Sequence, residues 1–167
     1  MGGIPGIGGP AMKRYATVLA LVVFFGSAGA ETIYSCDGDY SARENGGRQI
    51  EIDHAGRRLG VLKIDHSIDG GIFSLDNSIL VAFGLPNKVD PRSPQVTHLS
   101  VYLIKPKIGL LEKDVYGGGV YGATLSDDQK HLVVDNQFGV DVLNIETKQH
   151  ESFDATYVPN FAVQQCK

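Results

Sequence analysis

Tryptophan is absent from this sequence, and cysteine occurs only twice in 167 residues. Two cysteines are too few for the framework of a disulfide-dense mini-protein. A basic excess is also lacking, because 15 Lys and Arg face 19 Asp and Glu, so we expect no nucleic-acid partner. With 43% apolar and 20% charged residues, the chain is neither a disordered acidic polymer nor a collagen-like repeat.

The first thirty residues have the pattern of a secretory signal peptide. The basic pair Lys13-Arg14 precedes an apolar run from Tyr15 to Phe25, and the small residues Ala28-Gly29-Ala30 follow. This order predicts cleavage after Ala30 and export to the periplasm. The apolar run is shorter than the roughly 20 residues that span a bilayer, which disfavours a membrane anchor. We expect Met12 to be the initiator and residues 1–30 to be an extension that is removed.

Removal of that extension changes both the charge and the meaning of the cysteines. Because Lys13 and Arg14 leave with it and no acid does, 13 basic residues then face 19 acidic ones, a net charge of −6. We expect residues 31–167 to form one all-β domain. Cys36 and Cys166 lie near its two ends, and in an oxidising compartment two such thiols usually pair. A metal site or two free thiols are the alternatives, which the few nearby ligands and the exported location disfavour.

After residue 30 the sequence has the periodicity of strands. Short runs rich in Val, Ile, Leu, Tyr and Phe alternate with Gly, Asp, Asn and Pro, which is typical of an antiparallel all-β protein. We expect strands at Gln49–Asp53, Arg58–Asp65, Gly71–Leu75, Ile79–Gly84, His98–Ile104, Leu110–Val115, Val120–Leu125, His131–Asp135, Val140–Ile145 and His150–Asp154.

A repeat organises these strands into units. The segments Ser74–Leu80 and Ser126–Leu132 share the pattern Ser-x-Asp-x-x-x-Leu at an offset of 52 residues, and each follows a strand that begins with glycine. Ser and Asp side chains suit a tight turn because their oxygens accept backbone hydrogen bonds. Two further strands follow in each copy, so the pattern predicts two units of four antiparallel strands. The first unit carries an insertion, Leu85 to Thr97, with three prolines.

This order of strands and turns resembles a blade of the β-propellers of the periplasmic and YVTN type. In that family the turn often reads Ser-Pro-Asp-Gly-Lys, and Ser126, Asp128 and Lys130 match it, whereas Asp127 and Gln129 replace Pro and Gly. A closed propeller needs at least four blades of about 40–50 residues, which this chain cannot supply. The resemblance therefore implies an incomplete, two-to-three-blade propeller-like array of antiparallel sheets.

Small secreted half-propellers of this build resemble the immunity proteins of type VI secretion systems that guard the periplasm against injected peptidoglycan amidases. The likeness lies in the signal peptide, in the cysteine near the start of the exported chain, and in the segment Gly118–Leu132. In that family a loop after the matched strand plugs the toxin's catalytic cleft. The residues here that correspond to the loop, and which we predict to bind the partner, are Asp135, Asn136, Gln137, Phe138 and Gly139. This stretch lacks the serines of the family pattern.

Motifs for a metal, a cofactor or catalysis are not found in the sequence. The pairs Asp53-His54 and Asp65-His66 end the two arms of a predicted hairpin and could approach each other to bind zinc, or could simply close polar strand ends. Asp37-Gly38-Asp39 is similar to the start of a calcium loop, but Ala42 and Arg48 stand where the loop needs Gly and Glu. We therefore expect no metal and no cofactor.

Three functions follow from these observations. The first is a periplasmic immunity protein that inhibits a basic, peptidoglycan-degrading effector, which an acidic surface would attract. The second is a propeller-like envelope module that binds or scaffolds proteins. The third is a small secreted hydrolase whose carboxylates come from distant strands. For the first function, residues 135–139 and the insertion Leu85 to Thr97 are expected on the same edge of the sheets.

Overall fold

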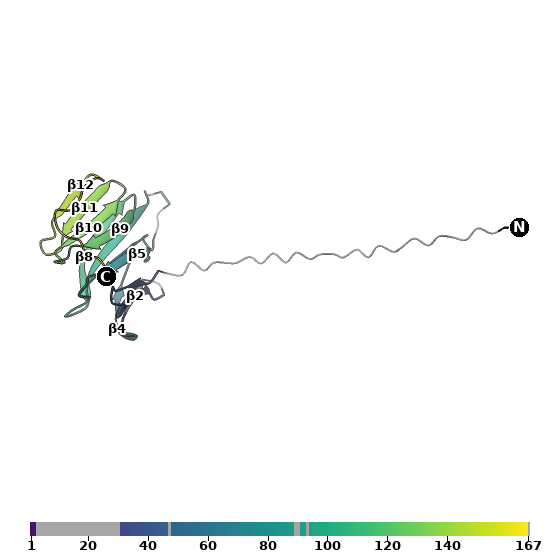
Figure 1. The fold of residues 1–167 in the computed structure, drawn as a ribbon, viewed down its shortest axis with the longest axis horizontal. Coiled ribbons are helices and arrows are strands. Elements are labelled where there is room, and N and C mark those ends of the chain that lie inside the picture. Colours follow the sequence, from purple (N-terminus) through teal and green to yellow (C-terminus); the bar gives the residue numbers. More distant parts are fainter. Residues whose placement is uncertain (3–30, 47, 89–90, 93, 167) are drawn as a thin grey trace.

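The computed structural model describes residues 1–2, 31–46, 48–88, 91–92 and 94–166, so the predicted signal segment lies outside the described residues. Within these ranges, all of the regular secondary structure is β-strand (Figure 1). The strands are β1 (Ile33–Tyr34), β2 (Tyr40–Glu44), β3 (Gln49–His54), β4 (Arg57–Lys63), β5 (Gly70–Phe73), β6 (Ile79–Gly84), β7 (Val96–Leu103), β8 (Gly109–Gly117), β9 (Val120–Leu125), β10 (His131–Asn136), β11 (Gly139–Asn144) and β12 (His150–Phe153).

The strands form three antiparallel sheets of four, and each sheet is a continuous stretch of the chain. Their orders are β1-β2-β3-β4, β5-β6-β7-β8 and β12-β11-β10-β9, and we call them blades 1, 2 and 3. The first strands of the blades lie next to one another, because β5 contacts both β1 and β9. The expected all-β, incomplete propeller-like array is confirmed. Blade 1 was expected only in part, and β1 and β2 complete it.

The central strands β6 and β7 of blade 2 are buried on both faces because a blade packs on either side of them. Strand β6 reads Ile-Leu-Val-Ala-Phe, the unbroken apolar run of a strand without a solvent face. Leu80 and Ala82 belong to the core shared with blade 1, whereas Ile79 and Val81 belong to the core shared with blade 3. Two hydrophobic cores between three sheets therefore hold the array together.

The outer face of blade 3 is covered by the end of the chain itself. Val133, Val140 and Val142 form a third apolar cluster there, and aromatic residues from Phe153 onwards pack over it, including Tyr157. The rings of Phe153 and Tyr157 are stacked with their centroids 3.8 Å apart. We call residues 154–166 the C-terminal strap. It removes from water an apolar face that a fourth blade would otherwise have to cover.

The outer face of blade 1 is polar instead. Glu51 of β3 is only 3% exposed, yet its carboxylate is held by Arg43 at 2.6 Å and by Arg58 at 2.5 Å. Arg43 also lies 3.3 Å from Asp53, and Asn45 donates to Glu51 at 2.7 Å. A buried charge is tolerated when it is paired and hydrogen-bonded in this way.

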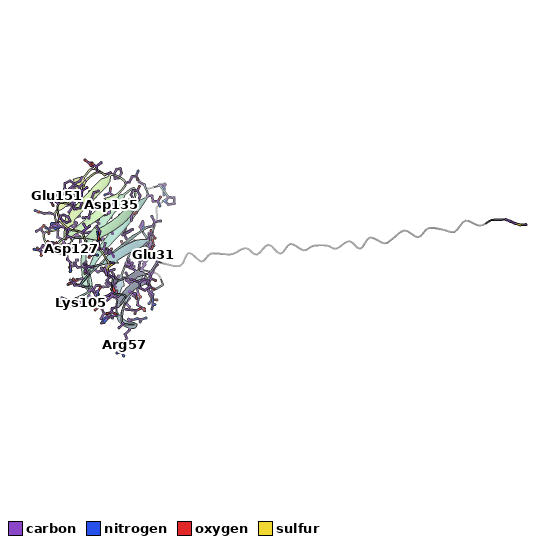
Figure 2. All side chains as sticks on the ribbon, in the orientation of Figure 1. Glu31, Arg57, Lys105, Asp127, Asp135 and Glu151 are labelled. Carbon is purple, nitrogen blue, oxygen red and sulfur yellow. A yellow bond between two sulfur atoms is a disulfide. The ribbon has the colours of Figure 1, made fainter. Side chains whose placement is uncertain are left out.

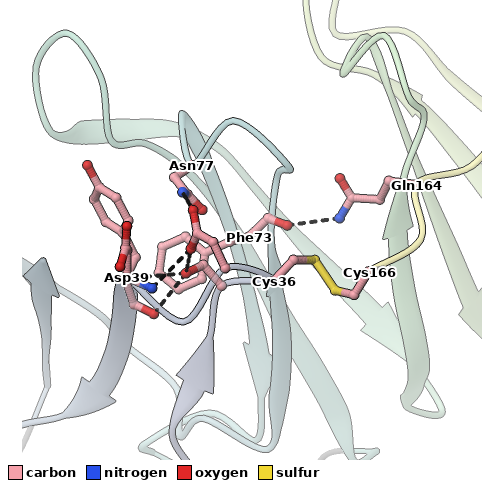
Figure 3. Close-up of a disulfide and its surroundings, with 9 residues drawn as sticks. Cys36, Asp39, Phe73, Asn77, Gln164 and Cys166 are labelled. Carbon is pink, nitrogen blue, oxygen red and sulfur yellow. Dashed lines mark hydrogen bonds between the residues drawn. A yellow bond between two sulfur atoms is a disulfide. The ribbon is translucent and has the colours of Figure 1, made fainter. Parts of the chain in front are cut away.

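The C-terminal strap joins all three blades before it ends (Figure 3). The backbone N–H of Gln164 donates to the carbonyl of Leu125 in blade 3, and its side-chain amide donates to the carbonyl of Phe73 in blade 2, both at 2.8 Å. Two residues later Cys166 is bonded to Cys36, which lies two residues after β1 of blade 1. The predicted disulfide is thus confirmed, and it links positions 130 residues apart.

The Ser-x-Asp turn occurs in all three blades. In blade 3 the hydroxyl of Ser126 donates to Asp128 at 2.6 Å and accepts the backbone N–H of His131 at 3.0 Å. The same two hydrogen bonds recur in blade 2 at Ser74 and in blade 1 at Ser35. The blade 1 turn contains Asp37 and Gly38, the residues that are similar to the start of a calcium loop. The fourth residue of each turn has a left-handed φ, at Gly38 (76°), Asn77 (60°) and Gln129 (61°).

These hydrogen bonds favour the ionised form of each turn aspartate. The hydroxyl of Ser35 is the main cause that lowers the pKa of Asp37 to about 2, and Ser126 lowers the pKa of Asp128 in the same way. Burial raises the pKa of Asp76, but the hydrogen bonds within its turn outweigh burial, so the net change is also downward. All three carboxylates thus bind protons less readily in the folded chain than their ordinary values imply.

We expect the fold to lose stability in acid through these turns. A lowered folded-state pKa contributes stability that is present above the unfolded value of 3.8 and is lost as the pH falls through about 2. The triple variant Asp37→Asn, Asp76→Asn, Asp128→Asn should therefore show a flatter decline in the urea midpoint from pH 5 to pH 2. Asp127→Asn, at the second position of the blade 3 turn, is the control and should keep the wild-type slope. An unchanged slope in the triple variant would contradict this assignment.

Candidate functional site

The predicted contact residues form a tight turn rather than a loop. Asp135 and Asn136 end β10 and Gly139 begins β11, so Gln137 and Phe138 alone make the connection. The amide of Asn136 accepts the backbone N–H of Phe138 at 2.9 Å. Gly139 has a φ of 142°, and a Cβ there would lie 2.1 Å from a backbone oxygen of β12. The turn is thereby fixed against the neighbouring strand.

This rigid turn holds an aromatic ring in solvent. Phe138 is 77% exposed, although its neighbour Asn136 is buried. The amide of Asn136 also donates to Asp141 across the hairpin at 3.0 Å, which secures the base of the turn. Figure 2 shows Asp135 on blade 3, far from Arg57 at the tip of the β3–β4 hairpin. An exposed aromatic side chain on a fixed backbone is a typical anchor for a protein partner.

The insertion in blade 2 reaches the same region. A hollow of about 550 Å³ separates the turn from the insertion, and its lining residues are Leu85, Pro94, Gln95, Thr97, Gly117, Gly118, Gly119, Gln137 and Phe138. Gly118 has a φ of 89°, and a Cβ on it would lie 2.0 Å from the Gln137 amide. Because Gly117, Gly118 and Gly119 have no side chains, the turn can lie directly against their backbone. We call Leu85, Gly117, Gly118, Gln137 and Phe138 the Phe138 face.

A second hollow on the other side of Phe138 is acidic. Its volume is about 330 Å³, and its walls include Asp114 of β8, Asp141 of β11 and His150 of β12. Burial raises the pKa of Asp114, and repulsion from Glu112 and Asp141 adds to the rise, which outweighs the attraction of His150 at 3.7 Å. A cationic side chain placed here would relieve that repulsion.

The two Asp-His pairs do not come together, contrary to the hypothesis of a zinc site. In the β3–β4 hairpin His54 pairs with Arg57 near the turn, whereas Gln49 pairs with Lys63 at the open end, beyond which Asp65 and His66 lie. His54 instead stacks on a tyrosine ring with centroids 4.3 Å apart. Among the described residues, no three His, Cys, Asp or Glu side chains are grouped so that they could hold a metal ion.

His66 forms a contact that the sequence could not indicate. Its Nε2 lies 2.9 Å from the hydroxyl of Ser100, 34 residues away, and its Nδ1 lies 2.7 Å from the carbonyl of Ser67. A serine beside a histidine is the geometry of a nucleophile and its base. However, His66 is fully buried, and Ser100 is only 2% exposed, at the wall of a hollow between blades 1 and 2. Burial also lowers the pKa of His66, and the neutral ring ties the β4–β5 connection to β7.

Across the described residues, no helix is long and apolar enough to cross a membrane. The intact disulfide is typical of proteins in an oxidising compartment.

Comparison with known proteins identifies the fold. No protein-family model matches the chain, and no curated protein matches it. Among solved structures it is similar to U3-55K, with a TM-score of 0.54 and 14% identity over 74% of this chain and 38% of that one. It is also similar to the WD40 repeats of RRP9, with a TM-score of 0.53 and 14% identity over 72% and 36%.

A third similar structure is the hydrazine synthase of Kuenenia stuttgartiensis, with a TM-score of 0.50 and 15% identity over 69% of this chain and 39% of that one. The chain thus spans less than two fifths of the length of these three structures. At such low identities the likeness concerns the fold alone, and that fold is part of a β-propeller.

Proposed function

We propose that this protein binds another protein through the Phe138 face, and that it serves as a periplasmic immunity protein against a peptidoglycan amidase. The observation that carries the proposal is the 77% exposed ring of Phe138 on a fixed two-residue turn. A rigid aromatic side chain loses little entropy when a partner covers it, so it can contribute much of the binding energy.

The hollows beside Phe138 support a protein partner. The larger hollow, of about 550 Å³, has Phe138 on one wall and the insertion of blade 2 on another. A partner that covers Phe138 can therefore also place a side chain in this hollow. In the immunity proteins that the sequence resembles, a loop after the matched strand enters the toxin cleft, and the resemblance assigns this turn to that loop. Phe138 takes the place of the serines of that family, so we propose that it is inserted as an apolar plug.

Charge supports a basic partner. The smaller hollow presents Asp114 and Asp141 next to Phe138, and the chain without its first thirty residues carries a net charge of −6. Complementary charge accelerates association and disfavours wrong partners. The Cys36–Cys166 disulfide and the predicted signal peptide support action in the periplasm, where a cell-wall-degrading effector would arrive.

The test replaces one exposed apolar side chain with a charge. Phe138→Asp should weaken binding to an amidase encoded beside this gene by about 30-fold, the equivalent of ~2 kcal/mol. Val158→Asp is the matched control, because Val158 is 79% exposed but lies on the C-terminal strap. Calorimetry gives both affinities, and peptidoglycan digestion shows whether inhibition is lost with binding.

Two results would decide against the proposal. If the wild-type protein does not co-elute with the neighbouring amidase, the immunity function is wrong, and a general envelope-binding module becomes the better interpretation. If the amidase binds but Phe138→Asp and Val158→Asp behave alike, the partner uses another face of the molecule.

A hydrolase that uses carboxylates is the second candidate, and the acidic hollow is the observation that favours it. A carboxyl group with a raised pKa in a cleft is a candidate proton donor. If Asp114 serves in this way, the purified protein should hydrolyse peptidoglycan or ester substrates, and Asp114→Asn should abolish the activity. An inert wild-type protein would eliminate this candidate.

A further inference from the structure

A third hollow lies between blades 1 and 2, and it shares no residue with the Phe138 face. Its volume is about 540 Å³. Blade 1 contributes Gln49 and Lys63, which pair at the open end of the β3–β4 hairpin, together with Arg48. Blade 2 contributes Tyr102 of β7 and Leu110 of β8. Hollows of this size between packed units are the usual sites of small ligands.

The charge of this hollow is opposite to that of the molecule. Three cations line it, and they face one carboxylate, Asp65. That carboxylate is already engaged, because Lys113 pairs with it and His98 lies 3.3 Å away. Within the described part of the chain, neither Arg48 nor Lys63 has an ion-pair partner. Two uncompensated cations therefore meet at one cavity of an acidic protein.

The position of Arg48 is enforced by the backbone. Its φ is 80°, in the left-handed region that a residue with a side chain rarely adopts. The carbonyl of Arg48 accepts the backbone N–H of Ile64 at 3.0 Å, directly after β4, which holds the two arms of the hairpin together at this end. An unfavourable conformation that the surrounding bonds maintain is a common feature of ligand sites.

Apart from Ser100, the rest of the wall is apolar. Tyr102 is 1% exposed and its hydroxyl lies 3.4 Å from the carbonyl of Lys63, so the ring forms a fixed wall between the blades. Ile64 is also buried, whereas Leu110 is 57% exposed at the rim. The hollow therefore combines an apolar wall with two cations that lack partners.

We propose that this hollow binds a small amphipathic anion, a carboxylate that carries an apolar or aromatic group. The carboxylate pairs with Arg48 and Lys63, and the guanidinium can hold both of its oxygens. The apolar group packs on Tyr102 and Leu110. N-acylated amino acids and the carboxyl ends of short peptides have this chemistry. The inference rests on this cavity alone and does not depend on the proposed function of the Phe138 face.

A matched pair of ligands tests the charge requirement. N-acetyl-L-tyrosine and its neutral amide have the same ring and backbone and differ in the carboxylate, so the acid should bind at least tenfold more tightly in a calorimetric or ligand-observed NMR titration. Arg48→Ala/Lys63→Ala should remove this preference. The control Arg57→Ala/Lys130→Ala deletes two other exposed cations and should retain it.

Each possible result of this experiment either supports or overturns the proposal. Equal affinity for acid and amide, an equal loss in both double variants, or no binding of the acid at millimolar concentration would each overturn the proposal. A urea titration of each variant confirms that the fold is intact. If Arg48→Ala/Lys63→Ala unfolds, Lys63→Glu replaces it, and the acid should then lose at least tenfold in affinity while the amide is unaffected.

Discussion

Replacing both cysteines with alanine should lower the free energy of unfolding by roughly 4–5 kcal/mol. The disulfide closes a loop of 130 residues, so its loss releases nearly the whole chain in the unfolded state. The folded state also suffers, because Cys166 anchors the end of the C-terminal strap. Once that end is free, the strap can leave the apolar face of blade 3, which holds Val133, Val140 and Val142.

Urea unfolding of Cys36→Ala/Cys166→Ala measures this effect. The control is reduction: dithiothreitol should destabilise the wild-type protein by a similar amount and leave the double variant unchanged. Limited proteolysis should cut within residues 154–166 first in the reduced protein. A loss of less than about 1 kcal/mol, the size of an ordinary point mutation, would show that the array holds its shape without the disulfide.

Phe73→Ala should cost about 3–5 kcal/mol, the range for a buried aromatic residue that leaves a cavity. Phe73 ends β5 and is 1% exposed in the core between blades 1 and 2, where its ring centroid lies 6.1 Å from that of Tyr40. Its carbonyl also receives the hydrogen bond from Gln164. The cavity would thus open where blade 1, blade 2 and the C-terminal strap meet, and a rigid backbone there cannot collapse to fill it.

The matched control is Tyr121→Ala. Tyr121 is also an aromatic strand residue, but it is 69% exposed on β9, so its truncation should change the free energy of unfolding by no more than about 0.5 kcal/mol. Thermal or urea denaturation of the two variants gives the comparison. Similar losses in both would contradict the assignment of Phe73 to the interface between the blades.

The strands of blades 2 and 3 could be predicted because each carries its own signal. β6 and β9 begin and end where expected, since apolar runs are bounded by turn residues on both sides. β1 has only two residues, and β2 reads Tyr-Ser-Ala-Arg-Glu, whose charged end resembles a surface loop. The strands β1 and β2 of blade 1 could therefore not be predicted, although the buried Tyr40 and Ala42 of β2 alternate as in any strand with one covered face.

The candidate site was predictable only in part for a different reason. The segment from Asp135 to Gly139 is continuous, so a repeat pattern could locate it. The acidic hollow draws Asp114, Asp141 and His150 from three strands, and the hollow between blades joins Arg48 to Tyr102. Such groups share no local spacing, and they become neighbours only when the register of the sheets and the packing of the blades are known.

The two ends of the array also decide whether molecules can stack into filaments. A copy that docks on blade 1 would have to strip water from the ion pairs of Glu51, which usually costs more than it returns. A copy that docks on blade 3 would have to displace the aromatic side chains that already occupy that face. Both outer faces therefore disfavour the docking of a blade from another copy of the chain.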